Sequence, residues 1–372
     1  MRTEGDFIKV NKWLLPLSWI YEAIVRFRNL LFDCGALESR SYQIPVISVG
    51  NITVGGTGKT PHVEYLIRLL QDKYNVTVLS RGYKRKSKGY ILASPGVGMS
   101  QIGDEPYQMA NEFPGIHVAV DKDRRHGIER IISDSATKST DVILLDDAYQ
   151  HRYVKPKLNI LLVDYHHLVT YDRMLPAGRL REPVSGKKRA DVVIVTKCPK
   201  NLTLMEYRVL AKALDLYPYQ TLFFTTISYC GLRPVFGEQK QRQPKINKQT
   251  NVLLLTGIAS PRQMVSDLSE SAGMIRPLAF GDHHQFTKKD VDRINAEFGS
   301  MQSPKIIITT EKDRTRLENL KGFSTEVKNK MFSMPIKVSF LLDGEEKFNK
   351  IITDYVRKDS RNSSVAETAH VN

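Results

Sequence analysis

Cysteine is scarce in this chain, which has Cys34, Cys198 and Cys230 among its 372 residues. Three cysteines far apart suggest neither a disulfide framework nor the closely spaced ligands of a zinc site, and a reducing compartment fits them best. The sequence has no internal repeat, and no small-residue cleavage site follows its apolar N-terminal segment in signal-peptide register. These absences argue against a disulfide-stabilised secreted domain.

Long uncharged apolar runs are also missing. The nearest approach is residues 13–32, which are rich in Leu, Ile, Val and aromatic residues but are interrupted by Glu22 and two arginines. A charge at mid-bilayer costs roughly 2.5–3.5 kcal/mol, whereas each Leu or Ile returns only about 0.3–0.6 kcal/mol. We therefore expect a membrane-associating helix that lies in the interface, with Trp13 and Trp19 at headgroup depth. The alternative is an ordinary core helix that caps the domain.

The chain has a strong excess of positive charge. Its 55 basic and 40 acidic residues give a net charge of +15, which implies an acidic partner: nucleic acid, anionic lipid or a phosphorylated substrate. Stacking aromatic residues are sparse among the basic clusters, so we expect no nucleic acid partner. The clusters are Arg81, Lys84, Arg85, Lys86 and Lys88, and Arg179, Arg181, Lys187, Lys188 and Arg189.

One segment, residues 45–61, has the pattern of a phosphate-binding P-loop. A β-branched run leads into a glycine-rich turn, then Lys59-Thr60, then a helical pattern. Glycines let backbone N–H groups turn toward phosphate oxygens, Lys59 would reach the β- and γ-phosphates, and the Thr60 hydroxyl would reach Mg²⁺. Thr53 stands where the usual motif begins with glycine. The predicted nucleotide-binding residues are Thr53, Gly55, Gly56, Thr57, Gly58, Lys59 and Thr60.

Apolar runs separated by helical patterns predict an α/β fold, with a doubly wound, mostly parallel sheet that carries the P-loop and a second, smaller α/β domain. We expect the P-loop domain over residues 1–220, the second domain over 221–357 and a disordered tail over 358–372. The final helix is expected from Glu345 to Val356, and residues 237–250 as a hairpin or loop. The expected strands are 44–49, 76–79, 116–120, 142–145, 160–163 and 192–195, then 222–227, 252–255, 274–278, 306–310 and 336–341.

Several acidic residues could carry chemistry. Asp146 and Asp147 end an apolar run, and in P-loop proteins such a strand lies near the loop and its acid holds Mg²⁺; either residue could instead cap a helix. Asp104, in Gly-Asp-Glu-Pro, is a candidate general base for a hydroxyl nucleophile or, alternatively, a helix cap. In the second domain, Asp282 and His283 form a possible acid–base or orienting pair.

Two segments resemble the guanine-reading motif of GTPases incompletely. Residues 196–199 read Thr-Lys-Cys-Pro, with proline in place of the aspartate. Residues 310–313 read Thr-Glu-Lys-Asp, which lacks the residue between lysine and aspartate. Neither supports guanine selectivity, so adenine is the expected base.

In combination, the motifs resemble the tetraacyldisaccharide 4'-kinase family, the lipid A 4'-kinases, from the N-terminal helix to about residue 345. The matching segments are 49–61 around the P-loop, Ser80-Arg81-Gly82-Tyr83, Gly103-Asp104-Glu105-Pro106, Asp146-Asp147 with Gln150-His151, Leu175-Pro176-Ala177-Gly178 with Leu180-Arg181-Glu182-Pro183, Asp282-His283 and Glu311-Lys312-Asp313. Each is modest alone, but together and in this order they are highly specific.

The resemblance implies transfer of the γ-phosphoryl group of ATP, with Mg²⁺, to the 4'-hydroxyl of a lipid-linked glucosamine disaccharide 1-phosphate. It implies Asp104 as the base, oriented by His283, and a metal site of Thr60, Asp146 and Asp147. Arg181 would offset developing charge beside Lys59. The residues expected to line the substrate cleft are Glu105, Glu182 and Arg81. The family's N-terminal helix docks on the cytoplasmic face of the inner membrane, whose anionic surface would be a second partner.

Two departures from the family pattern stand out. Ala148-Tyr149 replaces the glycine that commonly follows the aspartate pair, and Arg179 stands where proline is more usual, which could alter contact with the substrate headgroup. Two other functions remain open from the residues alone: a P-loop GTPase or metallochaperone-like NTPase, and a non-enzymatic basic membrane-binding module with a vestigial nucleotide site.

Overall fold

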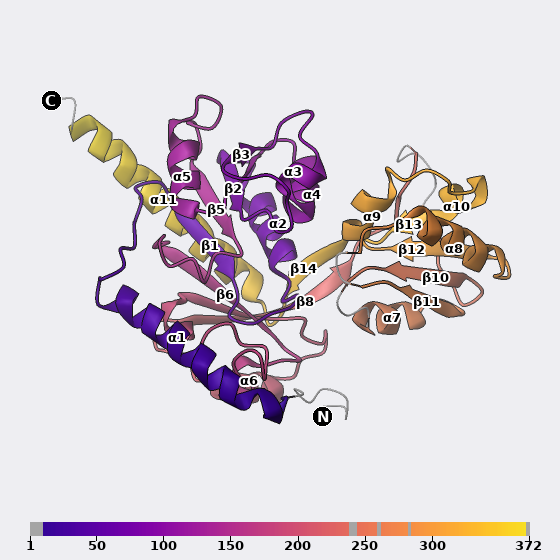
Figure 1. The fold of residues 1–372 in the computed structure, drawn as a ribbon, viewed down its shortest axis with the longest axis horizontal. Helices are drawn as coiled ribbons and strands as arrows, with labels where there is room; N and C mark the ends of the chain where they lie inside the picture. The colour runs from indigo at the N-terminus through magenta and orange to yellow at the C-terminus, as the bar shows by residue number, and fades with distance from the viewer. Residues whose placement is uncertain (1–9, 238–243, 259–261, 282–283, 370–372) are drawn as a thin grey trace. The chain divides into compact units, whose positions relative to one another are not determined.

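The computed structural model describes residues 10–237, 244–258, 262–281 and 284–369, and these divide into two compact units. Unit 1 comprises residues 1–227 and 338–372, and unit 2 comprises residues 228–337 (Figure 1). The strands of the sheet in unit 1 are β1 (Val46–Gly50), β2 (Val76–Ser80), β3 (Ile91–Leu92), β4 (His117–Val120), β5 (Val142–Asp146), β6 (Leu158–Asp164), β7 (Val192–Thr196), β8 (Thr221–Tyr229) and β14 (Ile336–Phe340). The helices of this unit are η1 (Lys12–Leu14), α1 (Leu15–Asp33), α2 (Lys59–Leu70), α3 (Met99–Ile102), α4 (Asp104–Glu112), α5 (Arg124–Ser133), η2 (Val169–Tyr171), η3 (Val184–Arg189), α6 (Leu204–Leu214) and α11 (Gly344–Ala369).

The strands of unit 1 form one sheet in the order β14-β8-β7-β6-β1-β5-β2-β4-β3. Each pairing from β8 through β4 is parallel, and the short edge strand β3 is antiparallel to β4. Strand β1, which precedes the predicted P-loop, lies between β6 and β5. This placement confirms the predicted doubly wound, mostly parallel sheet and puts the P-loop at its middle.

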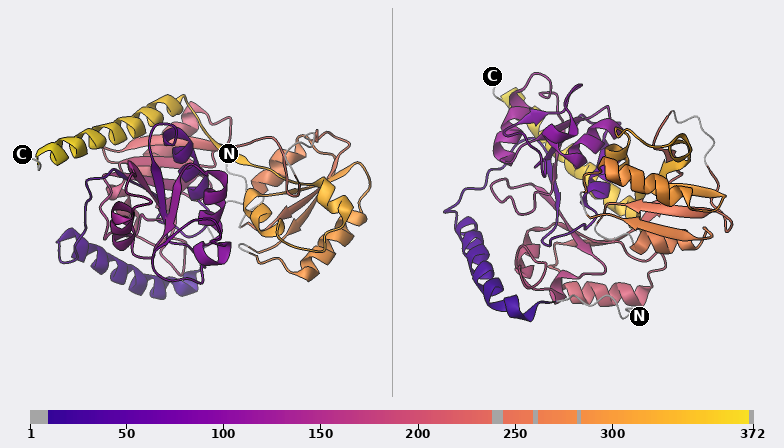
Figure 2. Two further views of the ribbon diagram at one scale, coloured as in Figure 1. Left: turned by 90° about the horizontal axis from the view of Figure 1, so that it is seen from above. Right: turned by 45° about the vertical axis from the view of Figure 1, so that its right-hand side comes forward.

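Alternate residues of the strands point to opposite faces, and helices cover both. On one face Ile47 and Val49 of β1 pack in a cluster with Leu66 of α2 and Phe348 of α11. The other face has two clusters. One contains apolar residues of α5, and the other packs residues of α1 and α6 against Leu161 of β6. Figure 2, left, shows α11 and α1 on opposite faces of this sheet. The near-continuous apolar strands of the sequence therefore reflect burial on two sides.

Unit 2 has a smaller mixed sheet in the order β11-β10-β12-β13-β9, parallel except for the β13–β9 pair. Apolar side chains fill both faces, with α8 on one and α7 on the other. Its strands are β9 (Arg233–Pro234), β10 (Asn251–Thr256), β11 (Ile275–Ala279), β12 (Lys305–Thr309) and β13 (Met331–Ser333). Its helices are α7 (Arg262–Ser269), α8 (Lys288–Gly299), α9 (Glu311–Leu317) and α10 (Thr325–Lys330).

The predicted domain limits need correction. The sequence assigned residues 221–357 to the second domain, but β8 pairs with β7, and β14 and α11 also belong to unit 1. Unit 2 is therefore inserted into unit 1. The apolar pattern of β8 and β14 shows that they are buried strands, but it does not show which sheet they join, because pairing partners are distant in the chain.

The C-terminal helix is also longer than predicted. We expected it to end at Val356 and a disordered tail to begin at residue 358, but α11 continues to Ala369. The segment after Gly344 contains neither proline nor another glycine, so no strong helix terminator interrupts it. The described part of the predicted loop 237–250 has no helix or strand, and residues 244–250 include a turn in which Thr250 N donates to Asn247 O.

Candidate active site

The P-loop lies between β1 and α2, and its backbone adopts the left-handed conformations that its glycines allow. Gly55 has φ +103° and Gly58, the N-cap of α2, has φ +83°. Gly50 is required for a different reason: a Cβ there would lie 2.7 Å from Cβ of Tyr149. The helix that follows presents Lys59 and Thr60 in its first turn, where unpaired backbone N–H groups and the helix dipole favour phosphate.

Side chains from neighbouring strands hold the carbonyl groups of the P-loop. Thr196 at the end of β7 donates its hydroxyl to Thr57 O at 2.9 Å. The next residue, Lys197, donates to Gly56 O and, at 2.7 Å, to Asp164 Oδ2. The Thr-Lys-Cys-Pro segment that resembled a guanine-reading motif thus supports the loop itself. The sequence of this segment does not reveal the contact, because the loop lies about 140 residues away.

A second segment, which leads to Arg181, lies along the other side of the loop. Thr53 and Leu180 form a β-bridge, Val54 N donates to Arg179 O at 2.8 Å, and Arg181 N donates to Ile52 O at 2.8 Å. The Arg179 side chain donates to Val54 O at 3.2 Å. The sequence suggests contact between Arg179 and the substrate headgroup, whereas the structure places its guanidinium against the P-loop, 2.4 Å from where a Cβ at residue 55 would lie.

His62 supports the P-loop from within α2. The ring is 6% exposed, its Nδ1 lies 2.7 Å from Gly58 O, and its Nε2 lies 3.1 Å from Oγ1 of Thr225 on β8. A carbonyl oxygen accepts only, so Nδ1 carries the proton and donates to Gly58. Burial lowers the pKa of His62 to about 4, which keeps the ring neutral, with Nε2 accepting from Thr225.

The predicted carboxylates gather beside Lys59. Its Nζ lies 3.6 Å from Asp147 Oδ1, and Arg181 Nη1 lies 3.7 Å from Asp147 Oδ2. Asp147 has φ +47°, a left-handed conformation that turns the chain sharply after β5. Asp146 is 1% exposed and accepts from Ser80 Oγ at 3.0 Å.

The acidic end of α4 also approaches Asp146. Burial chiefly, and then the charges of Glu105 and Asp147, raise the pKa of Asp146 to about 7, against the opposing effects of Lys59 and Ser80. Because Asp104 and Glu105 are the first residues of α4, that helix start lies near the Lys59 side of the sheet. His283, the predicted orienting residue, and Asp282 lie outside the described residues.

Arg124 is a site residue that sequence analysis missed. It is 2% exposed, donates to Asp146 O at 3.1 Å and lies within the electrostatic influence of Asp147 and Arg81. Burial lowers its pKa to about 10, so it remains a cation at neutral pH. Nothing in the sequence distinguishes Arg124 from the other basic residues at the start of α5, because its position depends on a contact with the end of β5, which lies elsewhere in the chain.

Glu182 is more enclosed than expected. It is 1% exposed, and its Oε2 accepts from Arg189 Nη2 at 2.5 Å. Arg189 also donates to Tyr149 O at 3.2 Å, so this pair connects the Arg181 segment to the segment after Asp147. That Glu182 lines the substrate cleft stays a prediction, as do the corresponding roles of Glu105 and the exposed Arg81.

The oxygen atoms near Lys59 fit a magnesium ion. Asp146 Oδ1 is buried and receives no hydrogen bond from the described residues, and Asp147 and the Thr60 hydroxyl offer further oxygen ligands close to the loop. Mg²⁺ prefers such ligands and keeps several waters when it bridges phosphates. The described residues contain no cluster of three or more His, Cys, Asp or Glu suited to a metal.

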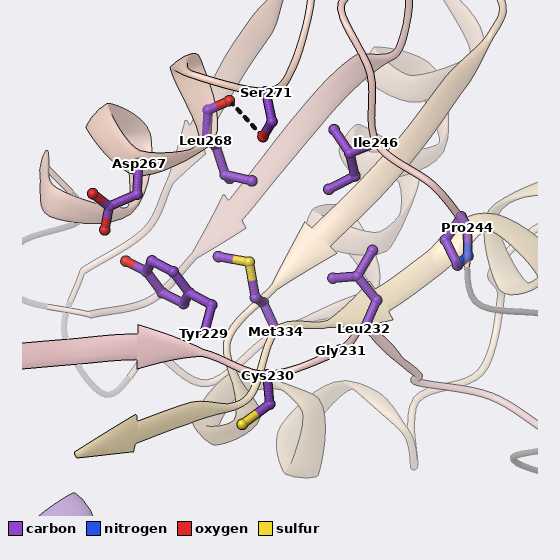
Figure 3. Close-up of a pocket in the computed structure, with 10 residues that line it drawn as sticks. All are labelled: Tyr229, Cys230, Gly231, Leu232, Pro244, Ile246, Asp267, Leu268, Ser271 and Met334. Atoms are coloured by element: carbon purple, nitrogen blue, oxygen red, sulfur yellow. Dashed lines mark hydrogen bonds between the residues drawn. The ribbon is translucent and has the colours of Figure 1, made fainter. Parts of the chain in front are cut away.

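Unit 2 contains a separate, mainly apolar pocket of about 300 Å³ (Figure 3). Leu232, Ile246 and Met334 line it, and the Tyr229 ring faces Asp267 at one end. Burial and Asp267 raise the pKa of Tyr229, so its phenol stays neutral. None of the predicted site residues lines this pocket.

This arrangement is that of a nucleotide-dependent phosphotransferase. It combines a P-loop whose carbonyls are held by side chains with a lysine, an acidic strand end and a nearby helix that begins with carboxylates. The comparisons agree: the family model for tetraacyldisaccharide-1-P 4'-kinase matches residues 10–357, and the chain belongs to this family. It is an ATP-dependent kinase that phosphorylates the 4'-hydroxyl of the disaccharide 1-phosphate precursor of lipid A, which confirms the predicted family, activity and nucleotide.

Relatives of the chain share nearly its whole length. It is 56% identical to a tetraacyldisaccharide 4'-kinase of Phocaeicola vulgatus over 97% of this chain and 99% of the relative. It is 42% identical to one from Porphyromonas gingivalis over 92% of this chain and 96% of the relative. A crystal structure of the Aquifex aeolicus enzyme LpxK in complex with ATP aligns with a TM-score of 0.69 and 32% identity, covering 92% of this chain and 98% of that one.

Proposed function

We propose that the groups around Lys59 perform the transfer as follows. Lys59 and the N–H groups of residues 55–60 bind the β- and γ-phosphates, and Arg181 offsets charge that develops on the transferred group. Asp146, Asp147 and the Thr60 hydroxyl hold Mg²⁺, which when bound neutralises phosphate charge. The observation that carries this proposal is the convergence of Lys59, Asp147 and Arg181 with the buried, unbonded oxygen of Asp146.

We assign the general base to Asp104. It begins α4, next to Glu105, whose charge acts on Asp146, so the start of α4 and the P-loop belong to one site. A sugar hydroxyl is a weak nucleophile, and a carboxylate positioned to take its proton contributes about 10²–10⁴-fold. His283 is proposed to orient this carboxylate, while Arg81, Glu105 and Glu182 are proposed to contact or shape the substrate site.

The decisive experiment compares Asp104→Ala with Asp104→Asn. Labelled ATP and the tetraacyldisaccharide 1-phosphate are incubated with each variant, and the lipid product is separated by chromatography. Both variants should lose about 10²-fold or more in turnover while still binding a fluorescent ATP analogue, since neither side chain takes up a proton. Asp104 is the first residue of α4, after the N-cap Gly103, so the alternative of a helix cap does not hold, and asparagine keeps the size and polarity of the side chain. Near-normal turnover of Asp104→Asn would remove the base from this proposal.

We also propose that the enzyme is a peripheral protein on the cytoplasmic face of the inner membrane, held there through α1. The solvent side of η1 and α1, opposite the buried Ser18, Val25 and Phe32, is apolar and exposed. Trp13 of η1 is 93% exposed and Ile24 of α1 is 62% exposed, and the other large exposed apolar residues of α1 are Leu17, Trp19, Ile20, Phe27 and Leu30. Glu22 and Arg26 pair with each other at 2.6 Å. Within the described ranges, none of the helices combines the length and the apolar character that crossing a bilayer needs. A helix of this kind fits the interface, with the acyl chains of the substrate remaining in the bilayer.

A further inference from the structure

We infer that α6 is a second membrane-contacting helix and that it binds the same anionic lipid surface as α1. This inference rests on the proposed membrane docking of unit 1 and extends it. Leu204, Met205 and Val209 of α6 are 68%, 77% and 61% exposed, which is unusual for three large apolar side chains on one short helix.

The exposed side of α6 combines these apolar residues with cations. At 3.6 residues per turn, Leu204, Arg208 and Lys212 follow one another along the helix, and Met205 and Val209 lie beside them. Arg208 and Lys212 are exposed. This mixture of apolar and basic side chains fits an anionic bilayer surface better than it fits water or a neutral apolar partner.

The acidic residues of α6 do not disturb this side. Glu206 accepts from the backbone N–H and hydroxyl of Thr203 in a capping box that starts the helix. Asp215 follows the last residue of α6, at its C-cap. The exposed side between Leu204 and Lys212 therefore carries positive charge.

The packing of α6 directs this side the same way as the apolar side of α1. Both helices cover one face of the large sheet, because Val25 of α1 and Leu210 and Leu214 of α6 are buried in a single cluster over Leu161 and Val193. Their exposed sides therefore point away from the same sheet face. Figures 1 and 2 show α6 close to the N-terminal end of α1. A flat bilayer that contacts α1 can thus also meet α6.

The first test measures binding to vesicles by sedimentation. The variant Leu204→Ser/Met205→Ser/Val209→Ser should partition at least tenfold less into vesicles of phosphatidylglycerol and phosphatidylcholine, on the order of the loss expected from removing three half-buried apolar side chains. Arg208→Gln/Lys212→Gln should lose about fivefold for each cation, and only with anionic vesicles. Met274→Ser is the matched control: this residue is 45% exposed and belongs to unit 2, which has no part in the proposed docking, so partitioning of this variant should not change.

The second test detects contact directly. The chain has two tryptophans, Trp13 and Trp19, so Met205→Trp in a background with both replaced by phenylalanine gives one reporter on α6. Its fluorescence should shift to the blue with vesicles and be quenched by brominated lipid. Turnover on substrate in detergent micelles and the melting temperature should match wild type in the variants of the first test.

The outcomes separate this inference from the docking of α1. If wild-type protein binds vesicles and the α6 variants bind equally well, or the reporter at residue 205 does not respond, the inference about α6 is wrong and docking through α1 stands. If wild-type protein does not bind vesicles at all, both fail. Loss of binding together with loss of turnover in micelles would indicate misfolding and would also count against α6.

Discussion

The P-loop end of the sheet and the outer side of α1 and α6 use the sequence in opposite ways. Around the P-loop, individual donors meet individual acceptors: Lys197 and Arg179 each donate to a particular backbone oxygen of the loop. On the outer side of α1, residues such as Leu17 and Ile24 share only an apolar character and exposure. The first region depends on geometry, so one atom matters; the second depends on area, so contributions add. This difference predicts how sharply each region responds to substitution.

The largest effect is expected for Lys59→Ala. The ammonium group neutralises charge on the transferred phosphate, and removal of one such preorganised group typically costs about 10²–10³ in turnover. Single-turnover assays with labelled ATP measure this loss. The control is Lys73→Ala, a change to an exposed lysine after the end of α2, which should retain wild-type turnover.

Asp146→Asn should come next and should separate metal binding from stability. We expect loss of about 10²-fold in turnover and loss of the rise in melting temperature that Mg²⁺ and ATP give the wild type. Measurement of both at several magnesium concentrations tests this. A variant that keeps the magnesium response would remove Asp146 from the metal site.

The same residue gives a pH dependence with a defined sign. In metal-free protein the pKa of Asp146 is about 7, above its value in the unfolded chain, so its contribution to stability is complete at low pH and is lost as pH rises through about 7. Wild-type protein without Mg²⁺ should therefore lose stability relative to Asp146→Asn between pH 5 and pH 8. Denaturant unfolding at these pH values measures the difference, and equal pH slopes for the two proteins would contradict it.

An intermediate effect is expected for His62→Phe. It removes the hydrogen bonds to Gly58 O and Thr225 while keeping an aromatic ring, and the loss of about 1–1.5 kcal/mol corresponds to about a tenfold higher KM for ATP, with a smaller change in kcat. His62→Asn keeps a donor near Nδ1 and should recover part of the affinity. Equal effects on KM and kcat in both variants would indicate general damage to α2 instead.

The smallest effect is expected for a single change on the membrane side, Ile24→Ser. Removal of one apolar side chain from an additive surface should lower vesicle partitioning only a few-fold, by about 1 kcal/mol, and should leave turnover in micelles unchanged. If this change abolished turnover in micelles, α1 would depend on exact geometry as the P-loop does, and the contrast between the two regions would be wrong.

The sequence predicted the local features of this molecule far better than the distant ones. The P-loop, the longer strands and the acidic end of β5 each depend on a short run of residues and lie where the sequence predicts them, whereas the short strands β3, β9 and β13 were not predicted. The support of the loop by Lys197, the burial of Arg124 and the return of β14 to the first sheet depend on partners many residues away. Patterns of hydrophobicity do not encode such pairings. The predicted roles of individual site residues stay predictions.

The insertion of unit 2 has a consequence for how the chain could be rebuilt. Residues 228–337 leave and re-enter unit 1 at adjacent positions, because Cys230 N donates to Pro335 O at 2.8 Å and β8 and β14 are neighbours in the sheet. A segment whose ends meet can be excised, shortened or exchanged with little disturbance to its host. The smaller unit is thus a cassette that could be produced separately, while a short turn joins β8 to β14.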